Sequence, residues 1–285
     1  MNIKIEVLPH QLGSINIFPK PVYWFEMPET FKEKEKIELL QRDIWIINLD
    51  ANTLNVESLK PNGIYFFNLD SGILSMRLND LAEKYKKLKK YTQMFLDIKP
   101  GKLVLHTAHI DEHLKKYFNQ PEVLYLEKNL YDSKTAINAV ISTTNSILEK
   151  SGAKSRSFLR IETSDELHFT AEISESQSNR TSKPVKARIK DISLNGMGFE
   201  LEDRTEINNF KLKDFIKINS SLFNYKIQLN MAIIARIDSN NGVIGVYFDL
   251  LNDKMIKEES ALTYKTILYH WLKEIIKNKE FIHPE

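Results

Sequence analysis

The segment VKARIKDISLNGMGFEL, residues 185–201, decides the fold of the C-terminal part of this chain. Apolar residues recur at every second position before and after its centre, which is typical of β-strands. Between the two runs lies the pattern D-x-S-x-x-G, formed by Asp191, Ser193 and Gly196, and these residue types favour turns. The segment therefore predicts two strands that flank a turn carrying a carboxylate and a hydroxyl.

The same alternation continues on both sides of this segment. Residues 167–173 precede it, and residues 225–237 and 243–250 follow it, with the turn signal Asn-Asn-Gly at residues 240–242 between the last two. Several strands of period two joined by short turns indicate a barrel or a sandwich. The pattern of residues 253–277 predicts a helix whose apolar face either covers the barrel or the N-terminal domain, or forms a dimer or partner surface.

A second short string, SRSFLR, lies upstream of these strands at residues 155–160. It places Arg156 and Arg160 four residues apart, just ahead of a strand-like run. The chain has only eight Arg against 32 Lys, so the use of two Arg here favours a need for guanidinium geometry and not for charge alone. In this order and placement the two strings resemble the ligand motifs of the PilZ domain family, over about residues 151–250.

The resemblance implies a six-stranded antiparallel β-barrel, at about residues 156–250, that binds cyclic di-GMP. Arginine suits both phosphate oxygens and the O6/N7 edge of guanine, whereas a carboxylate accepts from the guanine N1–H and N2–H₂ donors. The ligand residues expected from the resemblance are Arg156, Arg160, Asp191, Ser193 and Gly196, with Ser155, Arg188 and Asn195 as accessory positions.

The resemblance also implies how such a receptor would work. The arginine-bearing segment would close over the nucleotide, and because it joins two domains, binding would change their arrangement. No catalysis is expected. The expected output is control of motility, attachment, exopolysaccharide or virulence in a bacterium, through a protein partner of the N-terminal domain.

Positive charges gather just before the D-x-S-x-x-G pattern. Five Lys and Arg residues, among them Arg188, fall within residues 180–190 without a carboxylate. Arg188 shares its strand face with Lys186 and Lys190. The run is either a solvated outer strand face or a stripe that helps to hold phosphates.

Length and composition limit the number of domains, the class of ligand and the compartment that can be expected. A chain of 285 residues predicts two domains, residues 1–150 and residues 151–285, and each holds 20 basic and 19 acidic residues. This balance argues against bulk nucleic-acid binding. The absence of cysteine excludes disulfides and zinc–thiolate sites, and no signal peptide or membrane span is recognised, so a cytoplasmic protein is expected.

The sequence of the N-terminal domain predicts a mixed α/β fold, and it resembles no family that we recognise. Its expected strands are residues 2–8, 13–18, 22–27, 44–49, 54–59, 64–69, 102–107 and 123–127, and its expected helices are residues 31–42, 78–98, 111–119 and 132–150. Strands that alternate with helices favour parallel pairing. With the barrel and the C-terminal helix, the fold class of the whole chain is α+β.

A competing site lies in this N-terminal domain. His106, His109 and His113 fall within eight residues, with carboxylates beside them, and such a group could hold a metal in a metal-dependent enzyme. The H-E-x-x-H pattern is absent, however, and a polar loop between a strand and a helix explains the same residues. We expect cyclic di-GMP as the ligand and no metal.

Overall fold

The structure is a computed structural model in which the chain divides into two compact units, Pro19–Ser157 and one that contains Phe158–Glu285. The structure describes residues 17, 19–29, 31–49, 63–70, 93, 102–108, 110–127, 133–151, 157–163, 167, 169–175 and 183–277. Each unit contains its own sheet.

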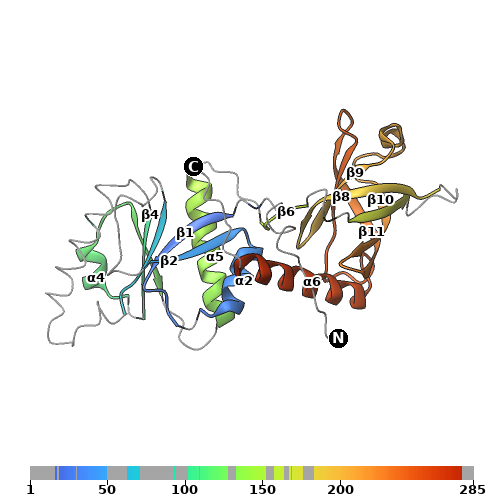
Figure 1. Ribbon diagram of the computed structural model, residues 1–285. Coiled ribbons are helices and arrows are strands. Elements are labelled where there is room, and N and C mark those ends of the chain that lie inside the picture. Colours follow the sequence, from blue (N-terminus) through green and yellow to red (C-terminus); the bar gives the residue numbers. More distant parts are fainter. Residues whose placement is uncertain are drawn as a thin grey trace. The chain divides into compact units, whose positions relative to one another are not determined.

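The first unit contains a five-stranded parallel sheet (Figure 1). Its strands follow the order β2-β1-β3-β4-β5, and every adjacent pair is parallel. The strands are β1 (Lys20–Phe25), β2 (Ile44–Leu49), β3 (Ile64–Asn68), β4 (Lys102–Thr107) and β5 (Val123–Glu127). The helices in the described part of this unit are α2 (Glu33–Gln41), α4 (Glu112–Tyr117) and α5 (Ser133–Lys150).

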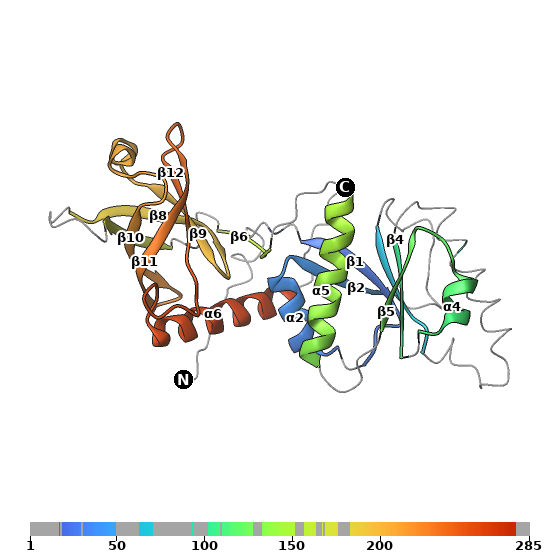
Figure 2. The same cartoon turned by 180° about the vertical axis from the view of Figure 1, so that it is seen from behind.

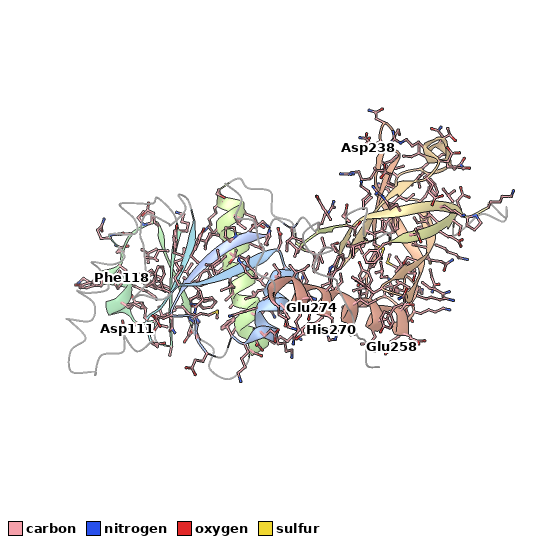
Figure 3. The ribbon with its side chains drawn as sticks, in the orientation of Figure 1. Asp111, Phe118, Asp238, Glu258, His270 and Glu274 are labelled. Atoms are coloured by element: carbon pink, nitrogen blue, oxygen red, sulfur yellow. The ribbon has the colours of Figure 1, made fainter. Side chains whose placement is uncertain are left out.

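Helices cover both faces of this parallel sheet. Trp24 of β1 is buried in a cluster with side chains of α2 and α5, whereas Phe25 is buried in another cluster with Phe118, which follows α4 (Figure 2). The N-terminus of α4 is capped by Asp111, whose Oδ1 accepts from the backbone N–H of Leu114 at 2.7 Å (Figure 3). The unit is therefore a doubly wound α/β structure, with strands buried on both sides.

The parallel α/β character predicted for this unit is confirmed. Strands 102–107 and 123–127 have the predicted bounds, and the predicted helices 31–42 and 111–119 are shorter by a few residues, at Glu33–Gln41 and Glu112–Tyr117. The predicted strands 2–8 and 54–59 lie outside the described residues, as do strand 13–18 apart from Ile17 and helix 78–98 apart from Gln93. The predicted strand 22–27 begins and ends two residues earlier, as β1 (Lys20–Phe25).

The second unit is a closed antiparallel barrel of six strands, as predicted. Its strands follow the order β8-β7-β10-β11-β12-β9, and a pairing between β9 and β8 closes the ring. They are β7 (Thr170–Glu175), β8 (Val185–Ser193), β9 (Gly196–Leu201), β10 (Phe215–Leu222), β11 (Tyr225–Asp238) and β12 (Val243–Tyr247). A 3₁₀ helix, η4 (Arg204–Asn209), follows β9, and the short strand β6 (Ile161–Glu162) pairs with the end of β8.

Alternation along the strands fills the barrel. The inward-facing residues Ile216, Ile218, Ile227 and Phe199 are fully buried, and the residues between them face outward. The pairing of β11 with β12 contains a bulge between Ile234 and Arg236, and similar irregularities interrupt the pairings of β8 with β9 and of β10 with β11. Bulges of this kind let long strands bend around a barrel.

The C-terminal helix α6 (Glu258–Lys277) packs against the barrel beside β11. Its Trp271 is fully buried and lies edge-on to the rings of Phe169 and Phe223. Tyr264 is also fully buried, and its hydroxyl donates to the backbone carbonyl of Ser193 at 2.6 Å. The apolar face that the sequence left open to an oligomer therefore packs within the same unit at these residues.

The helix begins later than predicted, at Glu258 and not at residue 253. Residues 253–257 instead form a turn in which Ile256 bridges to Leu229 of β11. The pairing with a distant strand outweighs the local helix propensity of residues 253–257. The periodicity of the sequence does not reveal such a long-range contact. No described helix combines the length and the hydropathy that are needed to cross a bilayer.

The Tyr264 hydroxyl provides a test of how α6 supports the barrel. Replacing Tyr264 by Phe keeps the ring but leaves the carbonyl of Ser193, a residue only 7 % exposed, without this donor. We expect the free energy of unfolding, measured in urea, to fall by about 1–2 kcal/mol. The control is Tyr269→Phe, the same change at a half-buried position of the same helix, which should leave stability unchanged. Equal stability of Tyr264→Phe and the wild type would contradict this role.

Candidate functional site

The D-x-S-x-x-G pattern forms the connection between β8 and β9. Asp191 and Ser193 lie in the last residues of β8, and Gly196 begins β9. A Cβ atom at Gly196 would lie 2.6 Å from the carbonyl oxygen of Val246, so the close approach of β12 requires glycine there. Ser193 is 7 % exposed, and its Oγ faces the Gly196 carbonyl oxygen at 3.3 Å and Asn195 Oδ1 at 3.4 Å. Ser193 and Asn195 therefore shape the turn itself.

Asp191 lies on the outer surface of the barrel, where its side chain is 21 % exposed. Its carboxylate extends across the neighbouring strand above Gly198. A Cβ atom at position 198 would lie 2.3 Å from Asp191 Oδ2. Glycine at position 198, which was not among the predicted site residues, is what allows the carboxylate to take this place.

The strand β6 brings Arg160 to this carboxylate. Glu162 pairs with Asp191 in the antiparallel contact of β6 with β8, and the backbone N–H of Thr163 donates to the carbonyl of Lys190 at 2.7 Å. Arg160 immediately precedes β6, and its Nη1 lies 3.9 Å from Asp191 Oδ2. Two motifs that are far apart in the sequence thus meet on one face. Ser155 and Arg156 lie outside the described residues.

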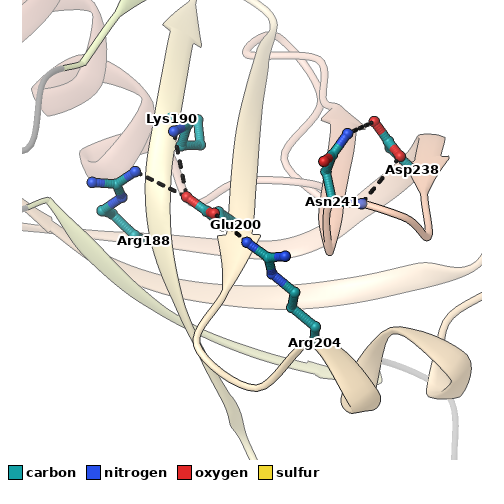
Figure 4. A network of polar contacts seen from close by, with 6 residues as sticks. All are labelled: Arg188, Lys190, Glu200, Arg204, Asp238 and Asn241. Atoms are coloured by element: carbon teal, nitrogen blue, oxygen red, sulfur yellow. Dashed lines mark hydrogen bonds and ion pairs between the residues drawn. The ribbon is translucent and has the colours of Figure 1, made fainter.

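Arg188 belongs to a charge cluster beside this face (Figure 4). Its Nη2 lies 2.9 Å from Glu200 Oε2, Lys190 Nζ lies 3.3 Å from the same oxygen, and Arg204 Nη2 lies 3.7 Å from Oε1. The positive stripe expected from the sequence is thus partly neutralised by Glu200, which faces Arg188 from the adjacent strand. The four groups together retain an excess of positive charge.

The cluster shifts the acidity of Glu200. Partial burial raises the pKa of this carboxyl, but hydrogen bonds from Arg188 and Lys190, together with their charges, outweigh burial and lower the pKa overall. In the turn between β11 and β12, Asn241 donates through its side chain to Asp238 at 2.9 Å and lowers the pKa of that carboxyl (Figure 4). Both carboxylates therefore stay ionised at neutral pH.

Tyr264 of α6 supports the turn from inside the unit through its bond to the Ser193 carbonyl. Burial, and in second place the negative charge of Asp191, raises the pKa of the Tyr264 hydroxyl well above its usual value. The hydroxyl therefore remains a proton donor at all physiological pH values. It connects α6 directly to the strand that carries Asp191.

Of the three residues in the alternative histidine site, the structure describes only His106 together with its side chain. His106 is 2 % exposed within β4, where its ring lies edge-on to Trp24 at a centroid distance of 5.2 Å. His109 and the side chain of His113 lie outside the described residues. Among the residues that are described, no group of three or more His, Asp or Glu side chains is arranged to hold a metal.

The carboxyl ends of the parallel strands form a second polar region, where ligands bind in many doubly wound proteins. Asp70 accepts from Thr107 Oγ1 at 2.9 Å and from the backbone N–H of Ala108 at 2.7 Å. The side-chain amide of Asn68 donates to the Glu26 carbonyl at 2.8 Å. These hydrogen bonds connect the carboxyl ends of neighbouring strands to one another.

A shallow hollow of about 580 Å³ lies elsewhere on the outer surface of the barrel, over β7, β10 and the start of β11. Thr170, Ser221 and Lys226 are among its lining residues, whereas Asp191 and Arg160 are not. We therefore place the candidate site at the β8–β9 connection, where Arg160 of one predicted motif meets Asp191 of the other, and not at this hollow.

The Glu200 cluster can be tested through its pH dependence. A pKa held below the usual value of 4.5 means that ionised Glu200 stabilises the fold at neutral pH, and that this contribution is lost as the pH falls through the folded-state pKa. We expect Glu200→Gln to lower the free energy of unfolding by about 1 kcal/mol at pH 7.

The difference between the Glu200→Gln variant and the wild type should disappear in acid, because wild-type Glu200 is then also neutral. Glu202→Gln, at an exposed position two residues later, is the matched control and should cause little change at any pH. A difference that grows as the pH falls would contradict the assignment.

Comparison with known proteins identifies the C-terminal unit. Residues 154–265 match the PilZ domain, over a range that contains β6 to β12, the Arg160–Asp191 contact and the first part of α6. A search of the curated proteins finds no match to this chain. PilZ domains form a family of cyclic di-GMP receptors. The C-terminal part of this chain, residues 154–265, is a PilZ domain.

Proposed function

We propose that this protein is a non-catalytic receptor that binds cyclic di-GMP at the β8–β9 connection of its barrel and passes the signal on through its N-terminal unit. One observation carries the proposal. The pairing of β6 with the end of β8 places the Arg160 guanidinium and the Asp191 carboxylate, from two separate motifs, 3.9 Å apart on an outward face.

The two groups suit different parts of the dinucleotide. Arg160, and with it Arg156, would bind phosphate oxygens or the O6/N7 edge of a guanine through the planar guanidinium fork. Asp191 would accept hydrogen bonds from the N1–H and N2–H₂ groups of a guanine, which adenine does not offer in this arrangement. Gly196 and Ser193 would hold the backbone of the turn against the ligand.

The contact between Arg160 and Asp191 is weak enough for a ligand to replace it. The Arg160 side chain is 47 % exposed and its contact with Asp191 is long, so breaking that contact should cost at most about 1 kcal/mol. A guanine that inserts between the two groups would give each of them a hydrogen-bonding partner. The ligand would thus replace a weak ion pair by charge-assisted hydrogen bonds.

The position of Arg160 suggests how binding leads to a signal. The boundary between the two compact units falls at residues 157 and 158, between Arg156 and Arg160. A ligand that engages both arginines would fix the connecting segment against the barrel and so favour one arrangement of the two units. The N-terminal unit would then present a changed surface to a protein partner that controls motility, attachment, exopolysaccharide or virulence.

Isothermal titration with cyclic di-GMP tests the binding site. Arg160→Ala and Asp191→Ala should each lower the affinity about ten- to a hundredfold, because each removes a charge-assisted contact. Lys217→Ala, at an exposed position of β10, is the control and should bind like the wild type. Asp191→Ala should also narrow the preference for cyclic di-GMP over cyclic di-AMP. Unchanged binding by either site variant would contradict its role.

The change in arrangement can be tested by fluorescence transfer, since the chain contains no cysteine and two can be introduced for labelling. Suitable exposed positions are Glu149 in α5 and Asn240 in the turn between β11 and β12. Saturating cyclic di-GMP should change the transfer efficiency in the otherwise wild-type protein, but not when Arg160→Ala is added at the same ligand concentration. A constant efficiency in protein shown to be saturated would contradict the switch.

A further inference from the structure

The outer face of the barrel next to Asp191 contains a row of residues in register across neighbouring strands. Asp191 of β8 pairs with Gly198 of β9, Gly198 pairs with Gly245 of β12, and Gly245 pairs with Arg236 of β11. The row therefore runs from a carboxylate, over two residues without side chains, to a guanidinium. Adjacent strands lie about 4.8 Å apart, so the row is about 14 Å long between its ends.

The two glycines have different surroundings. The space above Gly198 is filled by the Asp191 carboxylate, because a Cβ atom at position 198 would lie only 2.3 Å from Asp191 Oδ2. At Gly245, among the residues that the structure describes, a Cβ atom would have one heavy atom within 4 Å outside its chain neighbours, the Cβ of Arg236 at 3.4 Å, which is an ordinary contact. Within the described part of the chain, the surface above Gly245 is therefore open.

Nothing in the backbone requires glycine at position 245. Among the described glycines only Gly242 has a positive φ, and at Gly245 a side chain would fit without a clash. Glycine within a strand lowers stability, because it has more conformational freedom in the unfolded chain and no side chain to pack. Such a glycine often marks a place where a ligand approaches the backbone.

The groups around Gly245 suit a flat purine. Asp191 reaches toward it from one side, and Arg236 lies beside it on the other. Tyr247, two residues along β12 and 42 % exposed, presents an aromatic ring on the same face. A guanine has donors on its N1/N2 edge and acceptors at O6 and N7, which match a carboxylate and an arginine respectively. An aromatic ring provides a stacking surface for a base.

We infer that a guanine base of the ligand binds over Gly245, which forms the floor of the guanine subsite. Asp191 and Arg236 hydrogen-bond to the two edges of the base, and Tyr247 lies beside it. The inference rests on the proposed binding of cyclic di-GMP and assigns the place and orientation of one of its bases. Gly245, Arg236 and Tyr247 lie outside both sequence motifs. They become part of the site because β9 pairs with β8 on one side and with β12 on the other.

The test is the substitution Gly245→Val, which fills the floor with a side chain that the strand tolerates. We expect the affinity for cyclic di-GMP, measured by isothermal titration, to fall about tenfold or more. The melting temperature should stay equal to that of the wild type or rise, since valine favours strands. Ser221→Val adds a branched side chain at an exposed position of β10 and is the matched control, with wild-type affinity expected.

The possible outcomes separate this inference from the function on which it rests. Wild-type binding that is lost in Asp191→Ala but kept in Gly245→Val would overturn the subsite and leave the receptor intact. Absence of binding by the wild type would overturn both. If Gly245→Val unfolds, Gly245→Ala replaces it. That variant adds a single carbon at a 3.4 Å contact, and wild-type affinity in it would likewise overturn the subsite.

Discussion

The pairing of β8 with β9 is the interaction on which the C-terminal unit depends. It closes the barrel, from Ala187 opposite Leu201 to Ser193 opposite Gly196. The same register sets Glu200 opposite Arg188 and lays the Asp191 carboxylate over Gly198. A shift by one residue would turn every one of these side chains to the opposite face. The closure of the barrel and the placement of Asp191 in the candidate site therefore depend on the same strand pairing.

Two further elements hold this hairpin from either side. On the outer side, the short strand β6 adds to the end of β8 and delivers Arg160. On the inner side, α6 buries Tyr264 and donates its hydroxyl to the Ser193 carbonyl. The first support is only two residues long, and its Glu162 is exposed although Ile161 is buried, whereas Tyr264 of the second support is fully buried. This contrast fits the proposal that Arg160 exchanges partners when the ligand binds.

Much of the fold could be predicted from the sequence, because alternation of apolar residues follows directly from burial of one strand face. The run at residues 225–237 matches β11 (Tyr225–Asp238) almost residue for residue. The position of Glu200 could not be predicted as the partner of Arg188, since it depends on cross-strand register. The same holds for Gly245 and Arg236, which local patterns do not connect to Asp191. The late start of α6 has a similar cause, the bridge of Ile256 to a distant strand.

The most direct test of the central claim is a map of backbone amide shifts in isotope-labelled protein during titration with cyclic di-GMP. The account predicts the largest shifts along one face of the barrel, at Asp191, Gly198, Gly245 and the residues of β6. It predicts little change at Asp70 and Ala108, at the strand ends of the parallel sheet. Shifts concentrated at those strand ends, with the β8–β9 connection unaffected, would contradict it.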